Sequence, residues 1–258
     1  MRGARRSAQS INSLTGRGAA PRRPSTLRGV AERLRDLGIV VTGASRGLGR
    51  ALAEAFASEG ARLVLTATRS EHLASVLRTL GARAHGVPCD LRDGDSVDRA
   101  AREAVAALGR VDVLVNNAGM LGVRAPLAEY PIDLFADVIA VGVTGTLRLT
   151  QGVLPALSEG GAIINVTSGA AGRPLWGAYA VSKLAIDGMT RMLREELAPR
   201  RIRCVAINPG GIRTGMRAAA YPEEDPATLL HPSAVVEPFV AVAAGADPGW
   251  RVEAQQWR

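Results

Sequence analysis

The chain has 258 residues, of which 47% are hydrophobic and 22% charged, with a net charge of +8. A chain of this length can bury a sizeable core, and one α/β domain of this size is ordinary. No apolar run reaches the roughly 18–20 residues of a membrane-spanning helix, so no membrane association is expected. The two cysteines have no Cys or His at metal-ligand spacing, which predicts buried, reduced thiols, no metal site and a cytoplasmic location.

The positive charge is concentrated at the N-terminus. Residues 1–38 hold nine arginines and two acids, so the remaining 220 residues are close to neutral. The nine aromatic side chains are not interleaved with a basic patch, and nucleic acid is therefore not an expected partner. We interpret residues 1–36 as a disordered Arg-rich extension and residues 37–258 as the folded domain. The extension has the composition of an inert tail, a misassigned start or a transit peptide.

The folded domain is expected to begin with a short strand, a glycine turn and a helix, in I-V-V-T-G-A-S-R-G-L-G-R-A-L-A-E-A-F-A. Such a turn lets backbone amides approach a phosphate at the start of the helix, where free N–H groups and the helix dipole favour an anion. Because the turn joins a strand to a helix, we interpret it as a pyrophosphate site. The cofactor contacts predicted here are Gly43, Ser45, Arg46, Gly47, Leu48 and Gly49.

Strands and helices then alternate along the chain. This rhythm indicates right-handed crossovers and a parallel sheet with ligands at the carboxyl ends of its strands. We therefore predict a single doubly wound α/β domain of about seven strands, with helices on both faces. Further strands are expected at 62–67, 82–89, from 111, at 162–168, 202–208 and 251–254, and helices at 70–80, 93–108, 134–157, 176–198 and from 232.

The strand ends supply further cofactor contacts. After its second strand a dinucleotide fold carries an acid for an unmodified ribose or a base for a 2′-phosphate, and here Thr68 and Arg69 follow that strand. Together with Arg46, Arg69 could bracket a 2′-phosphate, although both also suit a solvated surface. NADP(H) is the preferred cofactor and NAD(H) the alternative. The later strand ends add Asp90, Leu91, Asn117, Ala118, Gly119, Pro209, Gly210, Ile212 and Thr214.

The segment Y-A-V-S-K places Tyr179 and Lys183 one helical turn apart on the same face. An ammonium beside a phenol favours the ionised phenol, so the pKa of Tyr179 is expected to fall toward neutrality. Lys183 is the only lysine among 32 basic residues, which indicates that arginine does not suit this position. The pair predicts a general acid/base, although a chance pair on an exposed helix has the same pattern.

Five motifs in this order resemble the short-chain dehydrogenase/reductase family over about residues 38–257: T-G-A-S-R-G-L-G at 42–49, N-N-A-G at 116–119, Ser168, Y-A-V-S-K at 179–183 and N-P-G at 208–210. The resemblance implies a Rossmann-type domain, a nicotinamide cofactor and a homodimer or homotetramer. It implies that Tyr179 exchanges a proton with the substrate oxygen, that Lys183 holds the nicotinamide ribose and that Ser168 binds the carbonyl. Ser168 precedes Tyr179 by 11 residues, fewer than is usual in the family, and Thr167 is the alternative.

One residue departs from the family pattern. Gly142 stands in D-V-I-A-V-G-V-T-G where the family usually has the asparagine of its proton relay. A glycine keeps a carbonyl for a relay water but loses the side chain and loosens the helix. We therefore expect an active enzyme with a weakened relay, in which Gly142→Asn raises turnover.

The leading interpretation is an NADPH-preferring oxidoreductase that interconverts a carbonyl and a secondary alcohol on a small-molecule substrate. The alternative is a cofactor-binding sensor or scaffold with little turnover. The proline-interrupted segment 213–231 is typical of a mobile substrate lid. An apolar substrate pocket is expected to use Leu121, Pro174, Leu175, Trp176, Gly211, Met216 and Tyr221.

Overall fold

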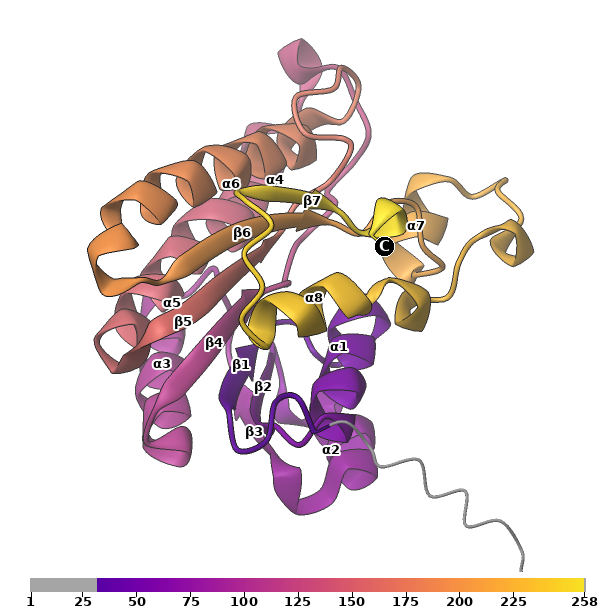
Figure 1. Ribbon diagram of the computed structural model, residues 1–258. Coiled ribbons are helices and arrows are strands. Elements are labelled where there is room, and N and C mark those ends of the chain that lie inside the picture. Colours follow the sequence, from indigo (N-terminus) through magenta and orange to yellow (C-terminus); the bar gives the residue numbers. More distant parts are fainter. Residues whose placement is uncertain (1–31, 258) are drawn as a thin grey trace, which may run out of the picture. The chain divides into compact units, whose positions relative to one another are not determined.

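The computed structural model describes residues 32–257 (Figure 1), and most of the predicted N-terminal extension lies outside the described residues. Its sheet has seven strands in the order β3-β2-β1-β4-β5-β6-β7, and all neighbours pair in parallel. The predicted doubly wound sheet is confirmed. The strands are β1 (Gly38–Val41), β2 (Arg62–Ala67), β3 (Ala84–Pro88), β4 (Val111–Asn116), β5 (Leu157–Val166), β6 (Arg203–Asn208) and β7 (Arg251–Glu253).

Helices cover both faces of the sheet (Figure 1). One core cluster joins the sheet to α1, α2 and α8, and a second joins it to α3, α5 and the end of α6. The helices are α1 (Gly47–Ser58), α2 (Ala74–Leu80), α3 (Gly94–Leu108), α4 (Ile132–Ile139), α5 (Gly145–Val153), α6 (Gly177–Glu196), α7 (Gly215–Ala220) and α8 (Glu237–Ala243).

The strands are apolar throughout because both of their faces are covered. In β1, Ile39 and Val41 belong to the first cluster and Val40 belongs to the second, as the alternation of side chains along a strand requires. All three side chains are fully buried. A continuous apolar run is thus the expected pattern for a central strand of this sheet.

The start of the helix predicted at 93–108 is set by its N-capping residue. The carboxylate of Asp93 accepts a hydrogen bond of 3.0 Å from the backbone N–H of Asp95, so Asp93 is the N-cap and the helix starts one residue later. The prediction of one continuous helix at 134–157 is wrong. A π-helical turn, Ala140–Thr144, separates α4 from α5, and β5 already begins at Leu157. Such turns frequently occur at functional sites.

The packed unit begins before the predicted boundary at residue 37. Leu34 is fully buried in the first core cluster. The guanidinium of Arg33 lies 2.6 Å from a carboxylate oxygen of Glu59, at the end of α1, and 2.6 Å from one of Glu237, at the start of α8. Residues 32–36, which the sequence assigned to the extension, therefore pack on the domain.

No helix within residues 32–257 is long and apolar enough to cross a membrane. The same residues contain no group of three or more His, Cys, Asp or Glu side chains placed to hold a metal ion. Cys89 and Cys204 are buried and not joined in a disulfide. Burial raises the pKa of the Cys89 thiol to about 11 and that of Cys204 to about 12, so both thiols stay protonated at neutral pH.

Candidate active site

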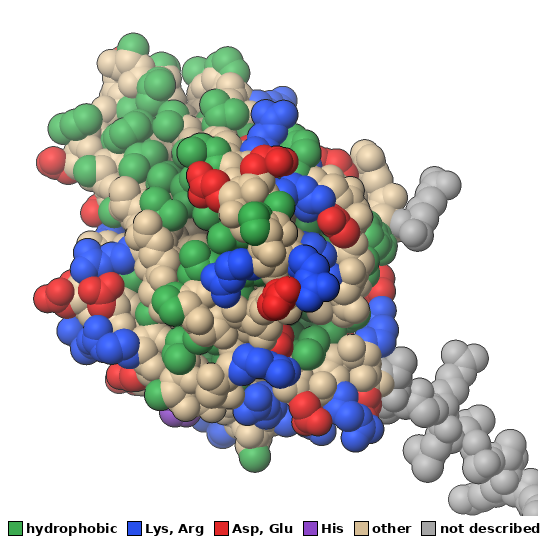
Figure 2. Space-filling view, turned by 60° about the vertical axis from the view of Figure 1, so that its left-hand side comes forward, with side chains coloured by type: hydrophobic (Ala, Val, Ile, Leu, Met, Phe, Trp, Pro, Cys, Tyr) green, Lys and Arg blue, Asp and Glu red, His purple; other side chains and the backbone are tan. Residues whose placement is uncertain are grey.

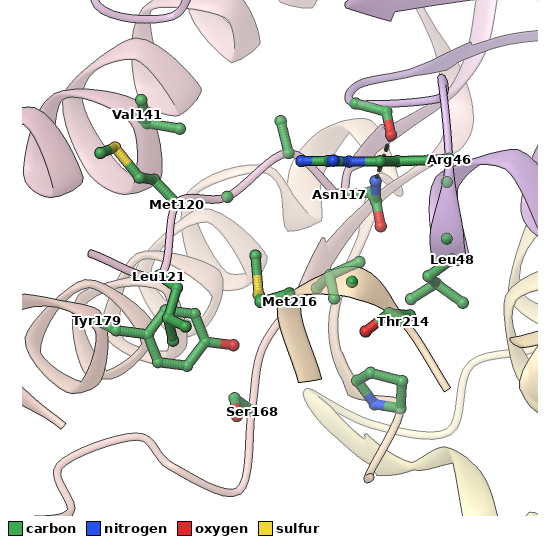
Figure 3. A pocket seen from close by; sticks show the side chains of 18 of the residues that line it. Arg46, Leu48, Asn117, Met120, Leu121, Val141, Ser168, Tyr179, Thr214 and Met216 are labelled. Carbon is green, nitrogen blue, oxygen red and sulfur yellow. Dashed lines mark hydrogen bonds between the residues drawn. The ribbon is translucent and has the colours of Figure 1, made fainter. Parts of the chain in front are cut away.

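The carboxyl ends of the strands open onto a cavity of about 540 Å³ (Figure 3). Among the predicted cofactor and catalytic residues, only Arg69 does not line it. Its wall is formed by the glycine turn, the ends of β2 to β6, helix α6 and helix α7, which belongs to the segment 213–231 predicted as a lid. The predicted residues that the fold brings together are Gly43, Ser45, Arg46, Gly47, Leu48, Gly49, Thr68, Asp90, Leu91, Asn117, Ala118, Gly119, Ser168, Tyr179, Lys183, Pro209, Gly210, Ile212 and Thr214.

The glycine turn forms one end of the cavity, and two of its glycines pack closely against neighbouring backbone. Gly43 has φ +64°, and a Cβ there would lie 3.0 Å from the Cα of Ala118, while a Cβ at Gly49 would collide with the Gly43 carbonyl. The side-chain amide of Asn117 donates to the carbonyl of Thr42 at 2.8 Å and fixes the turn against β4. The N-cap residue Arg46 makes no side-chain cap, so the first N–H groups of α1 stay free for a phosphate.

The three arginines near this end of the cavity differ in their placement. Arg46 lines the cavity, whereas Arg69 is exposed at the start of the short helix that follows β2 and does not line it. Arg92, which the sequence did not single out, also lines the cavity. Its guanidinium pairs with the carboxylate of Asp90 at 2.8 and 3.1 Å and lowers the pKa of that carboxyl. Of the two arginines predicted to bind a 2′-phosphate, only Arg46 therefore lines the cavity.

Tyr179 and Lys183 lie in the first two turns of α6 and are 8% and 5% exposed. The ammonium of Lys183 lies 5.7 Å from the centre of the Tyr179 ring and donates a hydrogen bond of 2.7 Å to the carbonyl of Val166. Burial lowers the pKa of Lys183 to about 8, and the charge of Asp187 opposes this change. Helix α6 therefore holds an ammonium against the end of β5.

The expectation that Lys183 lowers the pKa of Tyr179 is wrong. Burial of the phenol raises its pKa, and the Ser168 hydroxyl opposes that rise in part. Desolvation penalises the charged phenolate. The lysine ammonium donates its hydrogen bond to the carbonyl of Val166 and not to the phenol. The tyrosine is consequently a protonated acid at neutral pH.

Ser168 and Thr167 both line the cavity, and Ser168 stands beside the phenol of Tyr179 in Figure 3. The Ser168 hydroxyl accepts a hydrogen bond of 3.1 Å from the N–H of Ala170. The Thr167 hydroxyl is buried and has no hydrogen-bond partner within residues 32–257. The placement favours Ser168 as the group that meets the substrate oxygen.

Gly142 is buried in the middle of the π-helical turn. A Cβ at this position would lie 3.0 Å from the Cβ of Ser182 and 3.2 Å from its hydroxyl. Ser182 immediately precedes Lys183, so any side chain at position 142 must displace the residue next to the lysine.

The other end of the cavity is apolar, but it uses only part of the predicted pocket (Figure 3). Leu121, Trp176 and Met216 line it, while the prediction was wrong for the other four residues, namely Pro174, Leu175, Gly211 and Tyr221. Leu175 instead points outward and is 58% exposed. Lining residues that the sequence analysis did not single out include Met120, Val141, Arg217 and Ala220.

Comparison with known proteins identifies the class to which this fold and cavity belong. Residues 38–225 match the sequence profile of the family described as short chain dehydrogenase. The chain belongs to this family, and the resemblance inferred from the motifs is confirmed.

Individual relatives agree with this assignment. The chain is 38% identical over 213 residues to the uncharacterized oxidoreductase YciK of Escherichia coli K12, covering 79% of this chain and 84% of that protein. It is 35% identical over 192 residues to the 3-oxoacyl-(acyl-carrier-protein) reductase FabG of Aquifex aeolicus, covering 71% and 77%. A short chain dehydrogenase of Shigella flexneri 2a, solved in complex with NADP, superimposes with a TM-score of 0.82 at 34% identity, covering 87% of this chain and 99% of that one. One from Escherichia coli CFT073, complexed with NADPH, gives a TM-score of 0.81 at 34% identity, with coverage of 87% and 99%.

Proposed function

We propose that this protein is an NADPH-preferring oxidoreductase that interconverts a carbonyl and a secondary alcohol. One observation carries the proposal: the buried phenol of Tyr179, the hydroxyl of Ser168 and the ammonium of Lys183 meet on one wall of the cavity that begins at the glycine turn. A phosphate site and an acid/base site therefore share one cavity of about 540 Å³.

The residues fit a dinucleotide along this cavity. The free N–H groups of Gly47 and Leu48 at the start of α1 suit its pyrophosphate. Arg46 would pair with a 2′-phosphate, and neither Thr68 nor Arg69, the two residues directly after β2, is an acid that could bind an unmodified ribose. The NADP and NADPH in the two related structures support the same preference.

A bound reduced nicotinamide would supply the hydride. Tyr179 would donate its proton to the substrate oxygen, and the burial that raises its pKa keeps the phenol protonated for this role. Ser168 would orient the same oxygen with a hydrogen bond. Lys183 would hold the ribose, and its ammonium would favour negative charge on the oxygen in the transition state.

The test is NADPH oxidation with a panel of small ketones and aldehydes. Tyr179→Phe should reduce turnover by roughly 100-fold or more, while NADPH binding, measured by quenching of tryptophan fluorescence, stays intact. Tyr221→Phe is the matched control, because it removes a phenol outside the cavity wall, and it should retain activity. NADPH binding without turnover on any substrate, unaffected by Tyr179→Phe, would support the sensor or scaffold alternative.

Self-association is proposed through the face that carries α4 and α6. Large apolar side chains are exposed there: Ile132 at the start of α4 is 75% exposed, and Leu184 and Met192 of α6 are 56% and 63% exposed. Figure 2 shows hydrophobic side chains gathered at the top of the face it views. Exposed apolar surface of this kind marks an interface. Sedimentation should give a dimer or tetramer, and Leu184→Glu with Met192→Glu should give a monomer.

A further inference from the structure

A buried carboxylate lies one helical turn after Lys183. Asp187 is 7% exposed, and its Oδ2 accepts a short hydrogen bond from the guanidinium of Arg251 in β7. Its Oδ1 is also buried and has no partner within the part of the chain that the structure describes. Burying an ionised carboxylate oxygen costs free energy unless a hydrogen-bond donor or a positive charge interacts with it.

The ammonium of Lys183 has donors to spare. It carries three N–H groups, and the Val166 carbonyl is its one acceptor among the described residues. Gly142, at the position of the family's relay asparagine, brings no side chain. Since residues i and i+4 of a helix are neighbours, Asp187 is the acid that α6 itself places nearest to the lysine, and within residues 32–257 the two charged groups form no ion pair of 4.0 Å or less.

We propose that Asp187 is a positioning residue for Lys183: its carboxylate, anchored by Arg251, acts on the lysine through its charge, without a direct ion pair, and keeps the ammonium in its charged form. The free-energy cost of burying the lysine ammonium is then offset by a carboxylate of α6 and not by a side chain of the 140–144 turn. The inference rests on the proposed function only for its effect on turnover, because the charge of Lys183 can be measured without a substrate.

Few charged groups surround Lys183 and Asp187. Glu253 of β7 accepts from Arg251 at 3.1 Å and from the side-chain amide of Asn208 at 2.5 Å, so it shares the positive charge of Arg251 with Asp187. The end of β5, the 140–144 turn and residues 117–120 bring no titratable side chain. The remaining titratable groups on α6 near the lysine and on the elements packed against this helix are Tyr179, Asp133 and Asp137 of α4, Arg203 and Cys204 of β6, and, toward the far end of the helix, Glu159 of β5 and Arg200 of the 198–200 turn.

The experiment uses the single lysine of the chain. Incorporating lysine labelled with ¹³C at Cε into the full-length protein gives one side-chain resonance, whose shift with pH reports the charge of Lys183 directly. The wild-type midpoint is expected near 8. Asp187→Asn should lower the midpoint by about one pH unit, since a neighbouring opposite charge is lost, and Asp187→Glu should restore it.

Two further variants separate charge from damage to the fold. Arg251→Gln leaves Asp187 without its competing cation and should raise the midpoint, so the two substitutions act in opposite directions. Glu196→Gln removes an exposed acid from the last turn of α6 and should change nothing. If Asp187→Asn and Arg251→Gln both leave the midpoint unchanged, or both move it the same way, the proposal is overturned. Should Asp187→Asn fail to fold, a raised midpoint in Arg251→Gln supports the proposal and an unchanged or lowered one overturns it.

Discussion

Arg124, in the loop that follows β4, donates a hydrogen bond of 2.8 Å to the carbonyl of Ala220, at the end of helix α7 in the predicted lid. The same guanidinium lies 4.8 Å from the ring centre of Trp176 and 4.7 Å from that of Tyr221. The two rings are 5.8 Å apart. This arrangement connects the lid to two loops that are remote from it in sequence.

Arg124→Leu should loosen the lid, because it removes a hydrogen bond and two cation–π contacts, together about 2 kcal/mol. The KM for the carbonyl substrate should rise roughly tenfold, with a smaller change in kcat. Tryptic cleavage within 213–231 should accelerate. Arg173→Leu, which removes an exposed arginine near the same loops, should change neither quantity. An unchanged cleavage rate in Arg124→Leu would contradict this role.

Arg46 and Arg69 are expected to differ in their contribution to cofactor choice. Arg46→Ala should weaken NADPH binding by roughly 10- to 100-fold and leave NADH binding nearly unchanged, since only NADPH carries the phosphate that a guanidinium recognises. Arg69→Ala should have a weaker effect, because Arg69 does not line the cavity. Fluorescence titrations of both variants with both cofactors give the comparison. Equal losses of NADPH affinity in the two variants would instead support the sequence-based prediction that both arginines bind the 2′-phosphate.

Ser168 and Thr167 can be distinguished by removing each hydroxyl. Ser168→Ala should reduce kcat by about 100-fold, the scale of one donor lost at a developing oxyanion. Thr167→Val removes a buried hydroxyl that has no partner within residues 32–257, so activity should be retained and the melting temperature should stay the same or rise. A large loss of kcat in Thr167→Val alone would exchange the two roles.

Gly142 and Ser182 should show coupled effects on stability. Gly142→Ala places a Cβ 3.0 Å from that of Ser182, and the overpacking is expected to cost about 1–3 kcal/mol. Ser182→Gly provides the missing space, so the double variant should be more stable than the sum of the single effects predicts. Urea unfolding of the four proteins measures the coupling. The gain in turnover expected for Gly142→Asn is best tested in the Ser182→Gly background.

Lys183→Met should stabilise the fold below pH 8. The folded-state pKa of Lys183, about 8, lies below the ordinary lysine pKa of 10.5, so the unfolded chain binds more protons and wild-type stability rises as the pH passes from about 8 to about 10.5. The variant lacks this contribution. Its advantage should be about 3 kcal/mol at most near pH 7 and should vanish toward pH 10.5, as measured by urea unfolding. An advantage that does not change with pH would exclude this cause.

The features of the fold and of the candidate site that depend on short segments could be predicted from the sequence. The glycine turn, the order of strands and helices and the spacing of Tyr179 and Lys183 are local patterns, and the family resemblance assigned their roles. The carboxyl-end rule for parallel sheets then brought all but one of the predicted cofactor residues to one cavity. Arg69 does not line the cavity, because a residue that follows a strand can turn its side chain away from it.

Long-range pairings could not be predicted in this way. Arg124 is 96 residues from Ala220, and Asp187 is 64 residues from Arg251, so no local pattern marks either contact. The pKa of Tyr179 was predicted in the wrong direction because the spacing of two residues on a helix gives no measure of burial. The helix break at 140–144 was missed because α4 and α5 continue one apolar pattern across it.

The two ends of the described chain differ in their resistance to mechanical force. Strand β1 lies between β2 and β4, and the Arg33 ion pairs stand immediately before it, whereas the three-residue β7 is an edge strand with one neighbour. An ATP-driven unfoldase that pulls on the N-terminal side must break two ion pairs and then extract a central strand. One that pulls on the C-terminal side peels off a short edge. The protein should therefore be degraded faster when the degradation tag is placed at its C-terminus.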